Sequence, residues 1–338
     1  EVHAADEYME TYLEAALTWL GMYGIPVVLL SATLPPARRR ALLDAYRRGR
    51  GSSGEGAESV EGVIGYPVIS TLSAAGVHVH EITGEAEAPK RIIPTSLGSP
   101  DEIAELLDCE LVDGGCAVVI RNTVREAQET YDAVKAVFGR EQTTLLHSRF
   151  LAAERTSRDR RMLELFGKGA TRRPQRHVVV ATQVIEQSLD VDFDLMLTDP
   201  APMDLILQRI GRLHRHERAD RPVGLREARC LVVVEDLFAV PWAYSTGTDH
   251  VYSRHAVLRT LGILSDRGEI TVREPIDYAQ LTALAYSDVE TVGPSQWADA
   301  FDTALDERKR STAQSRMRAS TWCLDGMNVH RWKAPKLE

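Results

Sequence analysis

The chain has 338 residues and a formal net charge of −9 at pH 7, and this length suffices for about two domains of ~100–200 residues each. The acidic balance argues against a surface coated with positive charge for nucleic acid, although it allows a local basic groove. Its four cysteines have no C-x-x-C spacing, which disfavours a zinc site or a disulfide framework and favours reduced thiols in the cytoplasm. No apolar run reaches ~18 residues, so we expect no membrane-spanning helix and no membrane partner.

The first ninety residues predict short, mixed elements. Helical spacing of apolar residues indicates helices over 7–24 and 35–49, the second of them basic and opened by two prolines. Between these helices, "IPVVLLSAT" (25–33) predicts a short buried strand. The remaining segments are a loop over 49–62, an alternating strand over 76–82 and a linker over 84–90.

From about residue 91 the pattern becomes a regular alternation of strands and helices. Near-continuous apolar strands that alternate with helices predict a parallel sheet covered on both faces. In such sheets, ligands bind at the carboxyl ends of the strands. The last hundred residues lose this rhythm and are expected to be mostly helical. The predicted strands cover 116–122, 142–148, 177–183, 193–199 and 228–236, and the predicted helices 123–139, 154–167 and 203–215.

The last of these helices contains "DLILQRIGRLHRH" (204–216). Gln208, Arg212 and Arg215 stand at positions i, i+4 and i+7, which share one face of a helix. Each guanidinium can hold two oxygens at once, so arginines on one face suit a polyphosphate. The alternative is a solvated basic helix that makes surface ion pairs.

Four motifs resemble those of superfamily 2 helicases. "EVH" (1–3), "SATLP" (31–35), "ATQVIEQSLDVDFD" (181–194) and "QRIGRLHRH" (208–216) occur in the order and approximate spacing of motifs II, III, V and VI. Their wording is similar to that of the CRISPR-associated helicase–nuclease of type I interference systems, over most of residues 1–236. "VYSRHAVLRT" (251–260) resembles the accessory domain of the same family.

The resemblance implies an α/β fold with three parts. Residues 1–87 would be the C-terminal remnant of a first RecA-like domain, with motifs II and III. Residues 88–236 would form a second RecA-like domain, a parallel sheet with motifs V and VI. Residues 237–338 would be a mainly helical accessory domain.

The same resemblance implies roles for single residues. For the nucleotide, Glu1 matches a water-activating glutamate, Arg212 and Arg215 match arginine fingers, and Gln208 matches a contact to the γ-phosphate or to water. Ser31 and Thr33 match residues that couple hydrolysis to domain movement, although both could simply cap the following helix. Asp190 is expected at the nucleotide. For DNA, Thr182 and Gln183 match a phosphate contact, and His147, Ser148 and Arg149 at another strand end are a second candidate.

The chain departs from the family at two points. It has no P-loop, since Gly167-Lys168 is the only Gly-Lys pair and Met162 stands where the first glycine should be. It also has no His-Asp dipeptide for the nuclease's metal dyad, and Asp249-His250 is the reverse order. We therefore expect the nuclease and P-loop region upstream of Glu1, ATP and Mg²⁺ binding only together with that region, no metal within this chain, and no activity of this chain alone.

Two further sets of charges leave alternatives open. The acidic run Glu186, Asp190, Asp192 and Asp194 could hold a metal, but loop capping and turn hydrogen bonds are favoured. The basic stretch 149–176 is interleaved with glutamates and predicts a solvated helix, some of whose arginines could line a phosphate track.

The function that the resemblance implies is part of an ATP-dependent translocase on single-stranded DNA. It would serve CRISPR interference with an RNA-guided surveillance complex as partner. The alternatives are a truncated, non-hydrolysing module that binds DNA or a partner, and a superfamily 2 helicase acting on RNA.

Overall fold

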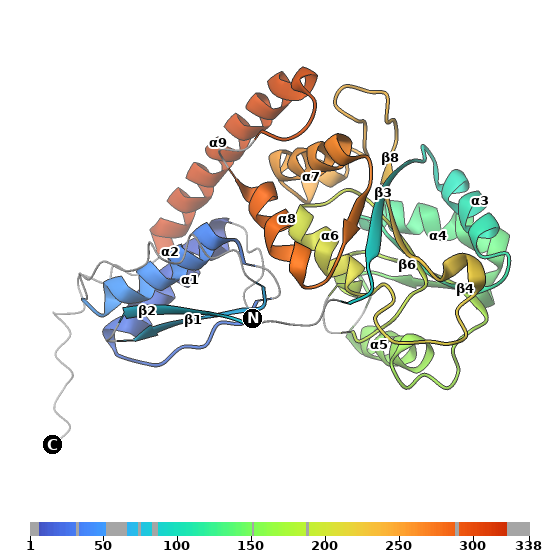
Figure 1. Ribbon diagram of the computed structural model, residues 1–338, viewed down its shortest axis with the longest axis horizontal. Coiled ribbons are helices and arrows are strands. Elements are labelled where there is room, and N and C mark those ends of the chain that lie inside the picture. The colour runs from blue at the N-terminus through green and yellow to red at the C-terminus, as the bar shows by residue number, and fades with distance from the viewer. Residues whose placement is uncertain are drawn as a thin grey trace. The chain divides into compact units, whose positions relative to one another are not determined.

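The computed structural model describes residues 7–31, 34–51, 66–73, 76–82, 87–150, 152–186, 189–287 and 291–322. Its internal contacts divide the chain into two compact units (Figure 1). One unit comprises residues 1–85 and 305–338, and the other comprises residues 86–304. We call the second of these the sheet unit.

The smaller unit contains two packed helices and a hairpin. Helices α1 (Glu7–Met22) and α2 (Pro36–Gly49) confirm the two predicted helices. They approach closely at Gly49, where a Cβ atom would lie 1.9 Å from the carbonyl oxygen of Thr18, so no larger residue fits. Strand β2 (Gly76–Glu81) confirms the predicted strand, and it pairs antiparallel with β1 (Val68–Ser73).

The strand predicted over 25–33 is wrong. Residues 25–31 carry no strand, and Val28 and Leu30 are 84% and 67% exposed. A strand with an uninterrupted apolar run needs neighbouring strands and two covered faces. In the described part of this unit no strand pairs with this segment, so most of its apolar side chains stay exposed.

The sheet unit is built around seven strands in the order β5-β6-β4-β7-β8-β3-β9. All pairs are parallel except β3 with β9, which is antiparallel. The predicted α/β fold with a parallel sheet is thereby confirmed. The strands are β3 (Lys90–Ser96), β4 (Gly115–Ile120), β5 (Thr143–Leu146), β6 (Arg176–Ala181), β7 (Leu195–Thr198), β8 (Ala228–Val234) and β9 (Ile270–Val272).

Alternate residues of the central strands point to opposite faces of the sheet, and both faces are covered. On one face, Ala117 and Val119 of β4 pack in a single apolar cluster with residues of α3 (Pro100–Glu110) and α4 (Val124–Phe138). On the other face, His177 of β6 meets Phe166 of α5 (Ala152–Phe166), with ring centroids 5.5 Å apart. Helix α6 (Met203–Ile210) lies on this second face, because its Arg209 bonds Thr198 of β7.

Residues after 236 add both helices and a strand to the sheet unit. Helices α7 (Arg254–Arg267) and α8 (Ile276–Tyr286) lie near α6 (Figure 1), and the hydroxyl of Tyr278 donates to the carbonyl of Leu207 at 3.0 Å. Strand β9 between them extends the sheet beyond β3. Helix α9 (Ala298–Trp322) follows, and its residues from 305 on belong to the smaller unit. The mostly helical character expected of this region is therefore present, together with one unpredicted strand. The division into three domains stays a prediction.

Candidate nucleotide and nucleic-acid site

The carboxyl ends of four neighbouring strands bring several predicted site residues to one edge of the sheet. The amide of Thr182, after β6, donates to the carbonyl of Leu146 at the end of β5 at 3.0 Å. The side chain of Gln183 donates to the carbonyl of Asn122, after β4, at 2.9 Å. The amide of Asn122 in turn donates to Asp199, after β7, at 2.7 Å. Ligands of parallel α/β sheets bind at such an edge.

A fully buried arginine, Arg209, lies at the centre of this edge. Its guanidinium contacts residues at the ends of β4 and β7, and Glu186, which directly follows η3 (Gln183–Ile185). A buried guanidinium requires partners for its donors, and this one has them. Its partners are Glu186 Oε1 at 2.7 Å, Thr198 Oγ1 at 2.6 Å, the Asp199 carbonyl at 3.1 Å, Asn122 Oδ1 at 3.3 Å and the Tyr252 hydroxyl at 3.0 Å.

Arg209 was not predicted, although the spacing of its neighbours in the sequence contained a signal. Ile206, Arg209 and Ile210 stand at i, i+3 and i+4, which is the spacing of a buried helix face. All three are buried. A single charged residue on such a face indicates a buried ion pair, and here the pair is with Glu186.

Asp199 is a second buried charge at the strand ends. Burial raises the pKa of its carboxyl group, and the charge of Arg121 opposes that rise. Arg121 Nε donates to Asp199 at 3.0 Å. Because its acceptors are occupied by Arg121 and by the Asn122 amide, Asp199 stabilises the strand ends.

The helix predicted over 203–215 is shorter than expected. The prediction that Gln208, Arg212 and Arg215 share one face of a helix is therefore wrong. Helix α6 ends at Ile210, and Gly211 is its C-terminal cap. Beyond it the chain bonds Phe193, whose amide donates to the Arg212 carbonyl and whose carbonyl accepts from the His214 amide, both at 3.0 Å. This pairing with a distant segment competes with further helical turns, so a turn carries the two arginines.

Arg212 lies half-buried beside Glu186. One terminal nitrogen donates to the Glu186 carbonyl at 3.0 Å, whereas the buried Nε has no hydrogen-bond partner among the residues that the structure describes. Burial, and then the charge of Arg215, lowers the pKa of Arg212. A buried donor without an acceptor is costly, so a bound oxyanion at this position would remove a penalty.

Arg215 and Asp190, both predicted at the nucleotide, form an ion pair with Nε and Oδ1 2.6 Å apart. Their side chains are 40% and 51% exposed, so the pair is solvated and contributes little to stability. Burial acts to raise the pKa of Asp190, but the hydrogen bond from Arg215 and the charge of His216 hold it below its ordinary value. A phosphate group would compete with Asp190 for Arg215. Gln208, four residues before Arg212, is half-buried within α6.

The residues predicted to contact DNA differ in accessibility. Ser148 and Arg149 are exposed and Gln183 is half-buried, whereas His147 and Thr182 are only 6% and 3% exposed. His147 stacks on Phe150 with ring centroids 4.1 Å apart, and the guanidinium of Arg158 lies 3.8 Å from the Phe150 ring. Phe150 was not predicted, because the loop that follows β5 carries no periodic signal, whereas Arg158 of α5 belongs to the basic stretch 149–176, some of whose arginines are candidates for a phosphate track.

The other predicted residues of the site lie elsewhere. Glu1 and Thr33 lie outside the described residues. Ser31 is half-buried in the smaller unit, and its role relative to the arginines stays a prediction. The acidic run makes long-range contacts rather than the favoured local loop caps, because Asp194 accepts from the distant Cys116 amide and Asp192 from the Arg215 amide, both at 2.7 Å.

Neither a metal cluster nor a membrane span is found where the chain is described. Within that part no group of three or more His, Cys, Asp and Glu side chains is arranged to hold a metal ion. None of the described helices is long and apolar enough to cross a membrane.

The parallel sheet, its polar strand ends and the arginines after α6 define a RecA-like α/β domain. Residues 113–218 match the family model described as "CRISPR-associated nuclease/helicase Cas3, C-terminal". The chain is 36% identical over 296 residues to the Cas3 nuclease/helicase of Streptococcus thermophilus, which covers 86% of this chain and 31% of that protein. It is 33% identical over 323 residues to Cas3 of Escherichia coli K12, covering 91% and 35% respectively.

Solved structures agree with the sequence relatives. A crystal structure of T. fusca Cas3-AMPPNP matches with a TM-score of 0.85 and 33% identity, over 96% of this chain and 38% of that one. A chain of a structure titled "CRISPR RNA-guided surveillance complex, pre-nicking" matches with a TM-score of 0.83 and 32% identity, over 96% and 40%. The chain is thus a relative of the Cas3 nuclease/helicases, as its motifs indicated, and it spans about a third of the length of the curated relatives.

Proposed function

We propose that this chain supplies half of an ATP-dependent translocase on single-stranded DNA that acts in CRISPR interference. In this proposal it works with a P-loop region and a nuclease outside its 338 residues, and an RNA-guided surveillance complex recruits the motor. The similarity to Cas3 nuclease/helicases and to a chain of a surveillance-complex structure supports this role.

The observation that carries the proposal is the environment of Arg212. Its buried Nε lacks a hydrogen-bond partner within the described part of the chain, and a second arginine, Arg215, lies nearby in a solvated ion pair with Asp190. A terminal phosphate would satisfy the first donor and attract the second guanidinium, since arginine forks match phosphate oxygens. Phosphoryl transfer depends mainly on positioning and on cations that stabilise the spreading negative charge.

Mg²⁺ would neutralise charge on the bound phosphates. In this proposal its ligands lie in the P-loop region outside this chain, and the described residues of this chain contact only the phosphates. With the cradling amides of a P-loop absent from the sequence, we propose that the chain alone binds ATP weakly and does not hydrolyse it.

A continuous set of contacts joins the proposed DNA side to the proposed nucleotide side. Gln183 bonds the backbone of Asn122, and the side chain of Asn122 bonds Arg209. Arg209 bonds the side chain of Glu186, whose carbonyl accepts from Arg212. We propose that movement of Arg212 onto a phosphate shifts Glu186 and, through Arg209, the grip of Thr182 and Gln183 on DNA.

The test uses this chain mixed with a separately produced P-loop region. We expect DNA-stimulated ATP hydrolysis in the mixture and none with either part alone. In the mixture, Arg212→Ala should lower kcat by about 10³-fold or more, the value of an arginine finger, while DNA binding persists. Arg125→Ala, which removes an exposed arginine of α4, is the matched control and should leave the rate unchanged.

Two results would contradict the proposal. Wild-type turnover by Arg212→Ala would remove the assigned role of the arginine. No hydrolysis by the wild-type mixture, with DNA binding intact, would favour a binding module instead. Competition between DNA and RNA of the same sequence separates the two helicase substrates, because proteins distinguish them through the 2′-hydroxyl.

A further inference from the structure

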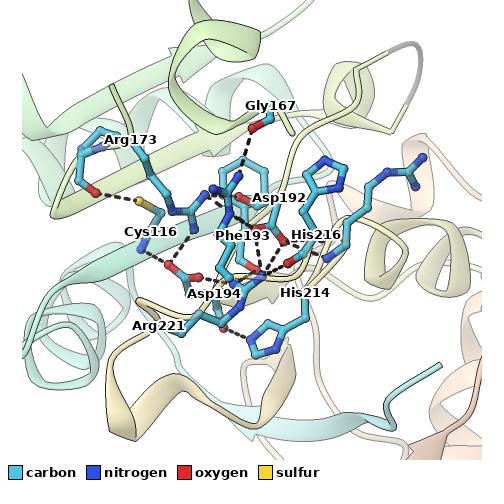
Figure 2. A network of polar contacts seen from close by, with 12 residues as sticks. Cys116, Gly167, Arg173, Asp192, Phe193, Asp194, His214, His216 and Arg221 are labelled. Carbon is cyan, nitrogen blue, oxygen red and sulfur yellow. Dashed lines mark hydrogen bonds and ion pairs between the residues drawn. The ribbon is translucent and has the colours of Figure 1, made fainter. Parts of the chain in front are cut away.

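Two buried aspartates, Asp192 and Asp194, contact the turn at 211–216 that carries Arg212 and Arg215; both are labelled in Figure 2. Asp192 and Asp194 are 0% and 2% exposed. They bind three arginines that come from two other segments, and we call this set the aspartate–arginine cluster. Its members are Asp192, Asp194, Arg173, Arg218 and Arg221.

Asp192 is the acceptor that ties the cluster to the turn. One carboxylate oxygen accepts from the backbone amide of Arg215 at 2.7 Å and from Arg221 at 2.9 Å. The other accepts from Arg218 Nε at 2.5 Å and again from Arg221 at 2.9 Å. Burial acts to raise the pKa of Asp192, but the charge of Arg221 and the hydrogen bond from Arg218 hold it below its ordinary value, so the group stays ionised at neutral pH.

The arginines extend the attachment on both sides of the turn. Arg221 donates to the His216 carbonyl at 2.8 Å and also pairs with Asp194. Arg218 donates to the Gly167 carbonyl, at the end of α5, at 3.0 Å. Figure 2 shows Asp192 pointing between Arg221 and the backbone next to His216. The turn is therefore fixed to a segment outside α6.

The turn needs this attachment because backbone hydrogen bonds to α6 reach only as far as Leu213, whose amide donates to the Ile210 carbonyl at 3.0 Å. His214, between the two arginines, has φ 49, a left-handed conformation that residues other than glycine rarely adopt. Such conformations persist only where surrounding contacts over-determine them. Here the His214 ring nitrogen Nε2 lies 3.2 Å from the Asp194 carbonyl, and its amide bonds Phe193.

We propose that Asp192 is a positioning residue for ATP hydrolysis, because it fixes the backbone from which Arg212 and Arg215 reach the nucleotide. This inference rests on the function proposed above. Two different aspartates bind Arg215: Asp190 accepts from its exposed guanidinium, and Asp192 accepts from its backbone amide. The guanidinium is free to exchange Asp190 for a phosphate while its backbone stays in place.

The test replaces Asp192 by the isosteric asparagine and follows two readouts. In the 338-residue chain, backbone hydrogen exchange over 211–217 should become about tenfold faster or more, while β4 and β6 stay protected, because exchange reports local opening. In the mixture with the P-loop region, kcat should fall about 100-fold, the effect of a displacement near 1 Å. KM for ATP and the fraction of protein that binds DNA should stay unchanged, whereas partial unfolding would lower that fraction.

Asp277→Asn is the matched control. Asp277 also accepts from a backbone amide and from an arginine side chain, both of Arg273, but at β9 and α8. This variant should change neither readout. Arg218→Gln is a second, milder test, because Asp192 keeps its bonds to Arg221 and to the Arg215 amide. It should shift both readouts in the same direction as Asp192→Asn. If Asp192→Asn does not fold, the Arg218→Gln result tests the positioning role in its place.

The outcomes separate the two proposals. Wild-type exchange of the turn or wild-type kcat in Asp192→Asn overturns the positioning role and leaves the proposed function standing. A wild-type mixture that hydrolyses no ATP refutes the proposed function and the positioning role with it.

Discussion

Removal of Arg209 tests whether a buried ion pair holds the strand ends together. Arg209→Met keeps the length and apolar character of the side chain and deletes the guanidinium. Glu186, whose side chain is 6% exposed, would lose its charged partner. Asn122, Thr198 and the hydroxyl of Tyr252 would each lose a hydrogen-bond donor.

The expected cost follows from the burial of both partners. Removing one member of a buried pair leaves an uncompensated charge and costs about 3–5 kcal/mol. The sheet unit runs from 86 to 304, and for a domain of that size each kcal/mol shifts Tm by about 2–4 °C. We therefore expect Tm to fall by about 6–20 °C. Arg209→Met with Glu186→Gln should recover part of this loss, because no unpaired charge remains.

The assay is thermal and urea unfolding of the 338-residue chain, followed by circular dichroism. Arg125→Met removes an exposed member of an i,i+4 pair on α4 and should leave the midpoint unchanged. A loss below about 1 kcal/mol for Arg209→Met, within the range of a surface pair, would refute the assignment of a buried ion pair. A double variant less stable than Arg209→Met would refute the reason given for its cost.

Two further predictions concern single groups of the sheet unit. Thr123 caps α4: its hydroxyl accepts from the Glu126 amide, and the Glu126 carboxylate accepts from the Thr123 amide. Thr123→Ala should lower the free energy of unfolding in urea by about 1 kcal/mol. Thr123→Ser keeps the hydroxyl and should lose less, so equal losses in the two variants would contradict the cap. Burial, with the charge of Arg161, lowers the pKa of His177 to about 4. Because the unfolded histidine takes up its proton near pH 6.5, this contribution to stability is present above that pH and is lost as pH falls towards 4, by about 2 kcal/mol between pH 7 and 5. His177→Gln should therefore reduce the change in the free energy of unfolding between pH 7 and 5. The same pH dependence in the variant and the wild type would contradict this role of His177.

The sequence by itself determined the α/β alternation of the sheet unit. Strands β4, β6 and β8 are apolar almost throughout and buried on both faces, so their local composition identifies them without reference to neighbours. It also placed Thr182, Gln183 and His147 at strand ends, because the end of an apolar run is visible in the sequence. That these ends lie together follows from the parallel arrangement of the strands.

Only the tertiary structure decided where α6 ends and which arginine is buried. The apolar period continues to Leu213. The backbone carbonyl of Arg212 and the amide of His214, however, bond Phe193, some twenty residues earlier in the chain. The run 25–30 shows the converse, since an apolar segment becomes a strand only where other strands pair with it. Arg209, Arg212 and Arg215 look alike in the sequence, but their surroundings differ. Arg209 bonds the side chains of Glu186 and Thr198, Arg212 bonds the Glu186 carbonyl, and Arg215 pairs with Asp190. Long-range contacts of this kind set the burial and charge partners of a side chain, and no local pattern encodes them.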